Sequence, residues 1–560
     1  MVSPAEVESF IARFEERLAP VEKTSSEAWW RLATTGTEEA QKELISTGME
    51  YNRLFANKDE YRLVKGWYEE RGSLESSILR RQVGILYKTF AGRQGDEETL
   101  RRIEELEAGA NATYSNHRGL VGGKETSENE LREILRTSHD SALRREAWES
   151  SKSVGREVEG AVRELARLRN QLARAEGYED HYARSLDLQE IDAVELDRLM
   201  DSLESATREP FRKLKSEIDA DLKGRFGAEE VLPWHLSDPF FQSCKQEAAT
   251  LPVCRTGDAS RAGDGGQVMS GGAGAVTDLD PNCFFRDKDL ETLTRKTYDN
   301  MGLEVRDVIA RSDLYERAGK DQHAFCIRIG RNYPYDVRVL ANLRHDSYWM
   351  DTMLHEFGHA VYDKNINPSL PYLLRTIAHI NSTEAIALMM GGLADDPGWL
   401  SSIAGVSEED LEGARERLPR ISRADRLVFV RWALVMYTFE KALYQDPDRQ
   451  DLNSLWWDLV ERIQLVNRPP DRNEPDWAAK LHVALAPVYY HNYVLGYLTA
   501  AQLRRHLEAI VGGPFYESEI AGRYLQEAIF GPGARDDWRT TVLRATGEEL
   551  NPAYFVETLR

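Results

Sequence analysis

The chain has 560 residues, of which 41% are hydrophobic and 30% charged, so it can bury a large core or several subdomains. Its formal net charge of −22 makes nucleic acid and anionic membrane surfaces unsuitable partners. No run of about 18 apolar residues occurs, and the four cysteines form no Cys-x-x-Cys pair, so we expect a cytoplasmic protein without membrane spans or disulfides.

The first fifth of the chain predicts a set of amphipathic helices. Apolar residues recur there at three- and four-residue steps, while Lys and Arg alternate with Glu on what would be the solvated faces. The expected helices span 4–20, 26–55, 59–70, 74–92 and 96–110.

The middle of the chain continues the helical pattern after a break at Gly119–Lys124. Long helices are expected over 139–175 and 192–227. The segment 255–280 is rich in Gly, Ser and Asp, which predicts a flexible loop, and no Gly-Lys-Ser/Thr follows that would make it a phosphate loop.

Strand-like sequence is confined to about 321–343. Asp336–Asn342 alternates apolar and polar side chains over part of its length, as a half-exposed strand does. Such a strand could offer its edge to the backbone of an extended peptide, or it could form a small structural hairpin. The two interpretations are compatible.

The segment 349–365 contains His355-Glu356-x-x-His359 within a helical pattern. Positions four apart share one helix face, so two imidazoles would aim at one point, as a zinc ion (Zn2+) requires. Glu356 could then take a proton from water on the open side of the metal. Asp346 and Ser347 are candidate caps. Gly358, unfavourable inside a helix, suggests a close neighbouring backbone.

A catalytic zinc usually has three protein ligands, and Glu384 is the candidate for the third. It lies 25 residues after His359, near the start of another helical run, and a turn between the two helices would bring it back to the imidazoles. The alternative is a Glu near a helix N-terminus whose negative charge interacts favourably with the helix dipole. Asp363, one turn past His359, could orient a ligand imidazole or be a solvated carboxylate. Helices are also expected over 425–444, 452–465 and 489–503.

A second group of polar side chains lies at 480–493, where a cation, an imidazole and several phenols occur within fourteen residues. A Tyr hydroxyl or a His N–H could stabilise the oxyanion of a tetrahedral intermediate, and Lys480 could hold a peptide carboxylate. The alternative is that the tyrosines are core or groove lining.

Taken together, these motifs make the chain resemble the gluzincin peptidases typified by angiotensin-converting enzyme (peptidyl-dipeptidase A), with thimet oligopeptidase and oligoendopeptidase F as relatives. The ordered combination of segments carries the resemblance better than the His-Glu-x-x-His motif alone. Besides that motif and Glu384, the matching segments are Ala147–Ser150, Arg169–Asp180, Gln322–Phe325, Asp336–Arg338, Trp456–Trp457 and Lys480–Tyr493.

The resemblance implies a role for each matched residue. His355, His359 and Glu384 would bind one zinc ion per chain, and Glu356 would act as general base and then general acid. The expected oxyanion-stabilising residues are His482 and Tyr493; the expected substrate-binding residues are Lys480 and Tyr490 for the C-terminal carboxylate, and His323 and Ala324 for the peptide backbone.

The implied fold is mostly α: a two-lobed helical ellipsoid with a deep central groove and a small β element beside the zinc helix. Residues 1–560 would form a single catalytic domain, with N-terminal helices that screen the groove. Lobe I would comprise about 1–120, 270–410 and 520–560, and lobe II about 121–269 and 411–519.

The chain also departs from converting enzyme. No glutamine occurs at 234–236, where one that binds the C-terminal carboxylate is expected, and the tyrosines lie one residue further from His482, which leaves Tyr489 as an alternative to Tyr490. The expected function is zinc-dependent hydrolysis of short oligopeptides, by a dipeptidyl carboxypeptidase or an oligoendopeptidase, monomeric or homodimeric. The alternative is a non-catalytic, zinc-containing peptide-binding protein.

Overall fold

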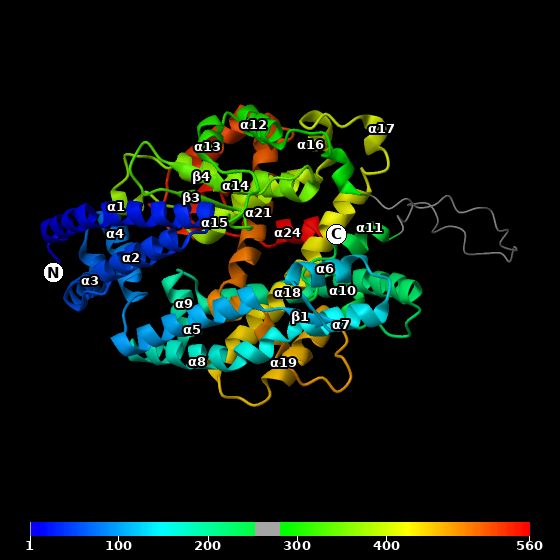
Figure 1. The fold of residues 1–560 in the computed structure, drawn as a ribbon. Coiled ribbons are helices and arrows are strands. Elements are labelled where there is room, and N and C mark those ends of the chain that lie inside the picture. Colours follow the sequence, from blue (N-terminus) through cyan, green and yellow to red (C-terminus); the bar gives the residue numbers. More distant parts are fainter. Residues whose placement is uncertain (1, 252–279, 560) are drawn as a thin grey trace, which may run out of the picture.

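The structure, a computed structural model, describes residues 2–251 and 280–559. Nearly all of its regular elements are helices, and the described chain adds only two small antiparallel sheets, so the predicted mostly α fold is confirmed (Figure 1). Polar caps start many of these helices; Asp96, for example, accepts a hydrogen bond from the Thr99 N–H. The loop expected over 255–280 lies outside the described residues, except for Asp280.

Four N-terminal helices share a hydrophobic cluster of residues 7–91, to which Tyr372 and Leu373 are added. They are α1 (Pro4–Thr35), α2 (Glu38–Phe55), α3 (Lys58–Glu69) and α4 (Ser77–Ala91). The predicted break after residue 20 was wrong. Pro20 lies inside α1, and the helix ends at Gly36, whose φ of 60° gives it a left-handed C-cap.

A second cluster contains side chains from residues 103–251 and 421–498, together with Trp538, Val542, Phe555 and Leu559, and we call it the lower lobe after its place in Figure 1. Its elements are α5 (Glu97–Asn116), β1 (Gly119–Val121), β2 (Lys124–Thr126), α6 (Glu128–Thr137), α7 (Ser141–Lys152), α8 (Val154–Ala175), α9 (His181–Leu188), α10 (Ala193–Phe226), α11 (Lys245–Thr250), α18 (Arg417–Gln445), α19 (Leu452–Leu459), α20 (Leu481–Leu485) and α24 (Ala553–Thr558).

A third cluster contains side chains from residues 284–418 and 500–545 and forms the upper lobe. Its elements are α12 (Leu290–Asn300), α13 (Arg306–Arg311), β3 (Phe325–Arg328), β4 (Val337–Leu340), α14 (Ser347–Lys364), α15 (Ile380–Gly391), α16 (Pro397–Ser402), α17 (Glu408–Leu411) and α22 (Glu519–Leu525). The helix α23 (Trp538–Thr546) contributes Ala545 to this cluster and two side chains to the lower one.

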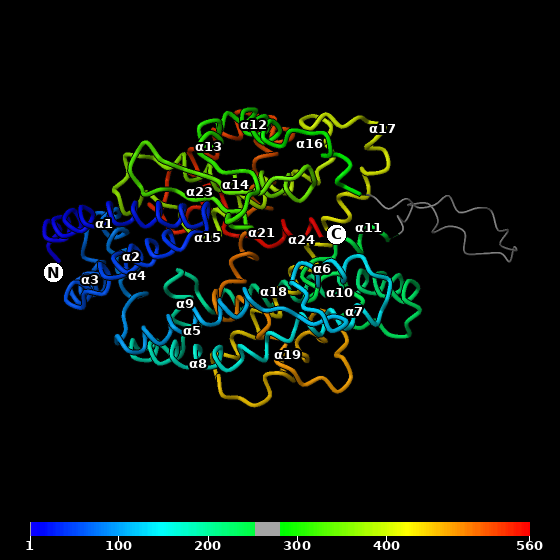
Figure 2. The backbone as a smooth tube through the Cα atoms, in the orientation of Figure 1, coloured from blue at the N-terminus to red at the C-terminus, as the bar shows by residue number. Residues whose placement is uncertain are grey.

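The helix α21 (Tyr490–Val511) belongs to both lobes. Val494, Leu495 and Leu498 pack in the lower cluster, whereas Leu503 and Leu507 pack in the upper one. The backbone trace shows this helix crossing from one group of helices to the other (Figure 2). A cavity of about 1060 Å³, as bounded by the described residues, is lined by side chains of both lobes.

The lobe boundaries expected from the sequence stay a proposal, and the clusters suggest refining them. Ile103 and Ala110 of α5 pack with the lower lobe, as does Phe555 near the C-terminus, although both segments were expected in lobe I. Phe515 packs with the upper lobe, although it was expected in lobe II. Apolar periodicity marks a buried face but not the helix it packs against, which explains these shifts.

The strand-like sequence at 321–343 forms the antiparallel pair β3–β4, in which Phe325 lies opposite Leu340 and Arg328 opposite Val337. The helix α14 contacts both strands. The small β element therefore lies beside the helix that contains His355 and His359, as predicted.

Candidate metal centre

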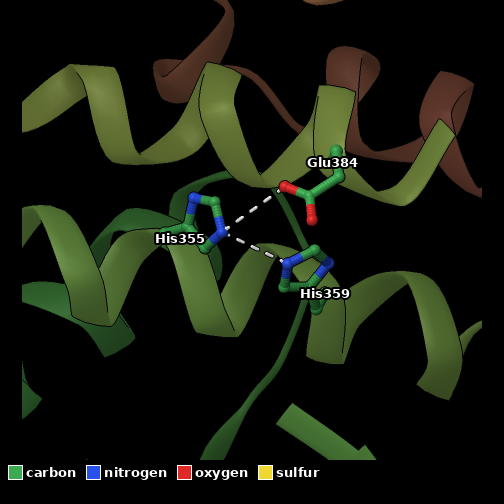
Figure 3. A group of neighbouring side chains, drawn as sticks. All are labelled: His355, His359 and Glu384. Atoms are coloured by element: carbon green, nitrogen blue, oxygen red, sulfur yellow. Dashed lines mark hydrogen bonds and ion pairs between the residues drawn. The ribbon is translucent and has the colours of Figure 1, made fainter. Parts of the chain in front are cut away.

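Asp346 caps the start of α14: its side chain accepts a hydrogen bond from the Trp349 N–H at 2.8 Å, so the predicted cap is confirmed. One turn separates His355 from His359, and both rings leave the same face of the helix (Figure 3). Their Nε2 atoms are 3.2 Å apart. Two imidazole nitrogens thus converge on one point.

Glu384 comes from the neighbouring helix α15, and its carboxylate faces the two imidazoles (Figure 3). Its Oε2 lies 3.8 Å from Nε2 of His355, and the ligand atoms of the three side chains all lie within 4.8 Å of one another. Two imidazole nitrogens and one carboxylate oxygen are a donor set that zinc accepts, with room for a further ligand. The three candidate metal ligands therefore fit the expected ion.

Two glycines allow the helices around this group to approach closely. A Cβ on Gly358 of α14 would lie 2.9 Å from Cα of Ala387 on α15, which confirms the expected close backbone. A Cβ on Gly496 of α21 would lie 3.1 Å from Cβ of Glu384. Since nearly all real Cβ contacts are longer than these two, α15 sits tightly between α14 and α21.

Burial sets the protonation of the candidate ligands. It lowers the pKa of His355 to about 4 and that of His359 well below its usual value, so both imidazoles are neutral near pH 7 with a lone pair to donate. Burial raises the pKa of Glu384 to about 7, against a hydrogen bond from the Tyr489 phenol that lowers it. A bound cation would favour the charged carboxylate.

Glu356 follows the first imidazole and is 8% exposed. Burial, and then the charge of Glu384, raise the pKa of its carboxyl to about 8, whereas a hydrogen bond from the backbone N–H of Cys326 lowers it. The Glu356 carboxyl therefore lies between Cys326 of β3 and the candidate metal ligands, in one cavity lining.

These groups line a cavity of about 450 Å³. Ala324 and Cys326 of the β3 segment form part of its wall, together with Glu22 of α1. His323 is exposed, and its N–H donates to Asp321 at 2.9 Å. The edge at Ala324 thus borders the cavity, whereas the His323 side chain faces solvent.

Asp363 also lines this cavity, and its carboxylate lies 3.2 Å from Nη1 of Arg328. The ring atom Nδ1 of His359 contacts a different residue, the hydroxyl of Thr383, at 2.7 Å. The contact that was expected for Asp363 is therefore supplied by a side chain that the sequence did not single out.

The second polar group divides into two parts in the structure. The first part faces the metal ligands: Tyr489 is hydrogen-bonded to Glu384, and burial followed by the charge of Glu384 raises the pKa of Tyr493 to about 12. Both phenols are therefore protonated near pH 7 and able to donate. Tyr489 was considered only as an alternative to Tyr490, yet it is the tyrosine that reaches Glu384.

The second part lies in the lower lobe around Lys480. Its Nζ donates to Oε1 of Gln242 at 2.8 Å, and burial lowers its pKa to about 8. Tyr490 is 3% exposed and packs against Trp432 and the ring of His482. Among the described side chains, Nδ1 of His482 is a buried atom without a hydrogen-bond partner, so it can still bind a further group.

Gln242, which the sequence did not single out, is the glutamine whose side chain meets Lys480. The turn at Asp238 carries it: this carboxylate accepts hydrogen bonds from the N–H groups of Phe240 and Gln242. Spacing along the segment Phe240-Phe-Gln242 does not say which residue faces Lys480, so the sequence alone offers no signal for this pair.

Other expectations concern the cysteines and the membrane. The three described cysteines, Cys244, Cys283 and Cys326, are free thiols, and Cys254 lies outside the described residues. Among helices of the described ranges, none combines the length and apolarity needed to span a bilayer.

A helical fold, a His-Glu-x-x-His helix and a glutamate from the next helix define a gluzincin metallopeptidase. The chain belongs to peptidase family M3, whose family model, described as "Peptidase family M3", matches residues 134–560. The model described as "Angiotensin-converting enzyme" matches residues 2–233. Both families are zinc-dependent peptidases, so the protein is a zinc metallopeptidase that hydrolyses peptide bonds.

Two curated proteins show how far the similarity extends. Angiotensin-converting enzyme-like protein Ace3 of Mus musculus is 22% identical, over 98% of this chain and 74% of its own length. Carboxypeptidase 1 of Bacillus subtilis (strain 168) is 25% identical, over 43% of this chain and 53% of its own length. The resemblance to converting enzyme and its relatives is therefore confirmed at the level of the family.

Proposed function

We propose that the protein cleaves short oligopeptides at a zinc ion held by His355, His359 and Glu384, with Glu356 as the general base. The convergence of the three ligand atoms within 4.8 Å, beside the buried Glu356 carboxyl, is the observation that carries this proposal. A zinc ion bound there would act as a Lewis acid on the scissile carbonyl and on a water molecule.

The side chains around the cavity have separate tasks in the proposed reaction. Glu356 accepts the proton of the attacking water and later passes it to the leaving amine, because its carboxyl lines the same cavity as the metal ligands and a bound zinc ion would favour its charged form against the raised pKa of about 8. Tyr493, whose protonated phenol lies close enough to Glu384 for that charge to raise its pKa, donates to the oxyanion. His482, whose buried Nδ1 has no partner among the described contacts, is the second proposed donor to the oxyanion.

Replacing Glu356 by Gln tests the general base. The amide keeps the size of the side chain but cannot accept the proton, so we expect stoichiometric zinc and a loss of kcat of at least about a hundredfold. Metal analysis and peptide cleavage, followed by mass spectrometry, measure both quantities. Glu384→Gln is the matched control and should lose zinc. Peptide cleavage by Glu356→Gln at the wild-type rate would refute the mechanism.

We further propose that the enzyme releases dipeptides from the C-terminus of its substrates. The pairing of Lys480 with Gln242 supports this subclass, because an ammonium and an amide side by side can hold a terminal carboxylate. Internal cleavage is the alternative if the groove admits chain on both sides.

A pair of peptides that differ only at the C-terminus separates the two subclasses. We expect amidation of the terminal carboxylate to raise KM at least tenfold, and Lys480→Met to raise KM for the free acid but not for the amide. Equal cleavage of both peptides, with products from internal bonds, would identify an oligoendopeptidase. Zinc binding without any product would favour the non-catalytic peptide-binding protein.

A further inference from the structure

The side chain of Thr383 lies behind one of the candidate metal ligands. Its hydroxyl is 2.7 Å from Nδ1 of His359, on the opposite side of the ring from the Nε2 that faces His355. Thr383 is only 5% exposed, so water does not compete freely for this contact. No other hydrogen bond of this hydroxyl is found within the described part of the chain.

The chemistry of an imidazole ligand decides the direction of this bond. Nε2 can bind a metal only when it carries a lone pair, so the proton of the neutral ring must lie on Nδ1. The hydroxyl of Thr383 then accepts from Nδ1–H, which fixes both the tautomer and the orientation of the ring. Thr383 is also the residue before Glu384, so one turn of α15 supplies a metal ligand and the contact that orients another.

Asp363 was the other candidate for this role, but its surroundings give it a different task. It lies 3.2 Å from the guanidinium of Arg328, which in turn donates to the carbonyl of Arg375 at 2.7 Å. The pair ties α14 to β3 and to the segment before α15. A carboxylate engaged in this way leaves the His359 ring to the neutral hydroxyl of Thr383.

We propose that Thr383 is a positioning residue that orients His359 for zinc through its hydroxyl. This inference rests on the proposed metal ligands. The hydroxyl alone carries the effect, so Val, which has the same shape and no hydroxyl, should lose it, and Ser, which keeps the oxygen, should restore it. Partners of this kind typically contribute 10- to 100-fold to metal affinity, and we expect a loss of about that size for Thr383→Val.

The experiment measures zinc affinity by competition with a chelator for wild type, Thr383→Val and Thr383→Ser, all as full-length protein. Thr294→Val is the matched control: Thr294 is fully buried in α12, and its hydroxyl donates to the Leu290 carbonyl at 2.8 Å. Thermal unfolding midpoints with and without chelator separate metal binding from folding. The expected Thr383→Val protein has the wild-type midpoint in chelator and a lowered one with zinc.

The outcomes are distinct. Weaker zinc binding by Thr383→Val, near-wild-type binding by Thr383→Ser and no effect of Thr294→Val would support the inference. Equal zinc affinity of wild type and Thr383→Val would overturn it and leave the proposed function standing. A wild-type protein without stoichiometric zinc would overturn the proposed function and this inference together.

Discussion

Val488 shows how a single residue is held in an unfavourable conformation beside the site. It has a φ of 55°, which a β-branched residue rarely adopts and which costs roughly 1–3 kcal/mol. Both of its backbone groups are bound by side chains: the N–H donates to Glu440 at 3.1 Å, and the carbonyl accepts from Gln189 at 3.2 Å. The turn therefore fixes the start of α21, from which Tyr489 influences Glu384 and Tyr490 packs into the lower lobe.

Glu440 makes the stability of this turn depend on pH. Burial raises its pKa to about 8, so folding favours the protonated carboxyl, and the stabilisation is complete below about pH 4.5 and lost as pH rises through about 8. We expect Glu440→Gln, which keeps the acceptor for the Val488 N–H but cannot ionise, to remove this loss. Thermal unfolding midpoints between pH 5 and 9 measure it. Parallel pH profiles of variant and wild type would contradict the assignment.

For single residues of the candidate site, the sequence was sufficient where the residues belong to one local pattern. His355, Glu356 and His359 are fixed by helical periodicity, and Glu384 follows from the need for a third ligand. Gln242 and Thr383 act only because tertiary packing brings them to Lys480 and His359, and nothing in their own sequence neighbourhood marks that partner. Pattern reasoning therefore finds ligands more readily than the residues that orient them.

The contact between α14 and α15 is the element on which the candidate centre depends. Gly358 costs up to about 1 kcal/mol of helix propensity compared with Ala, so only packing explains it. A Cβ at this position would meet the Ala387 backbone at 2.9 Å, which forces α15, and Glu384 with it, away from the imidazoles. The steric cost of a Cβ at residue 358 therefore exceeds the gain in helix propensity that Ala would bring.

The comparison of Gly358→Ala with Gly160→Ala tests this balance. Gly160 lies in the exposed middle of α8, and no atom lies within 4 Å of the place that a Cβ would take, so its replacement should raise stability by up to about 1 kcal/mol. Gly358→Ala should instead lower the unfolding midpoint and weaken zinc binding. Chelator competition and thermal unfolding give both values, and a Gly358→Ala protein as stable as Gly160→Ala would refute the packing argument.

Helices as elements were mostly predictable, but their ends were less so. The pattern of apolar residues suggested a break after residue 20, whereas α1 continues to Thr35 and ends at Gly36. A left-handed glycine and its contacts decide that end, and apolar periodicity does not report on either. The assignment of α5 to a lobe likewise depended on packing.

The N-terminal helices contact the segment 317–321 through the end of α1, where the chain turns into α2. The Asp321 N–H donates to the Ala33 carbonyl at 2.8 Å, and Arg317 donates to the Thr34 carbonyl at 2.7 Å. Gly36 and Gly319 meet so closely that a Cβ on Gly319 would lie 2.7 Å from the Thr35 carbonyl oxygen. This attachment lies just before the segment that leads into β3 and the cavity wall.

Replacing Gly319 by Ala should loosen that attachment without touching the candidate metal ligands. We expect faster amide hydrogen exchange in the last turns of α1 and in 320–325, a higher KM for peptides and unchanged zinc content. Gly123→Ala is the control, because Gly123 also has a positive φ, 76° against 81° for Gly319, but nothing lies within 4 Å of its Cβ position. Equal exchange in the two variants would show that the contact contributes nothing beyond backbone strain.

The close contact between Gly496 and Glu384 divides α21 into a short N-terminal part and a much longer C-terminal part. Tyr493 lies three residues from this point, or about 4.5 Å along the axis, whereas Val511 lies fifteen residues away, or about 22 Å. A tilt of about 10° around the contact would then move Tyr493 by less than about 1 Å and Val511 by about 4 Å. A tilt of α21 about this contact would therefore displace the backbone of Tyr493, beside the candidate metal ligands, far less than the far end of the helix in the upper lobe.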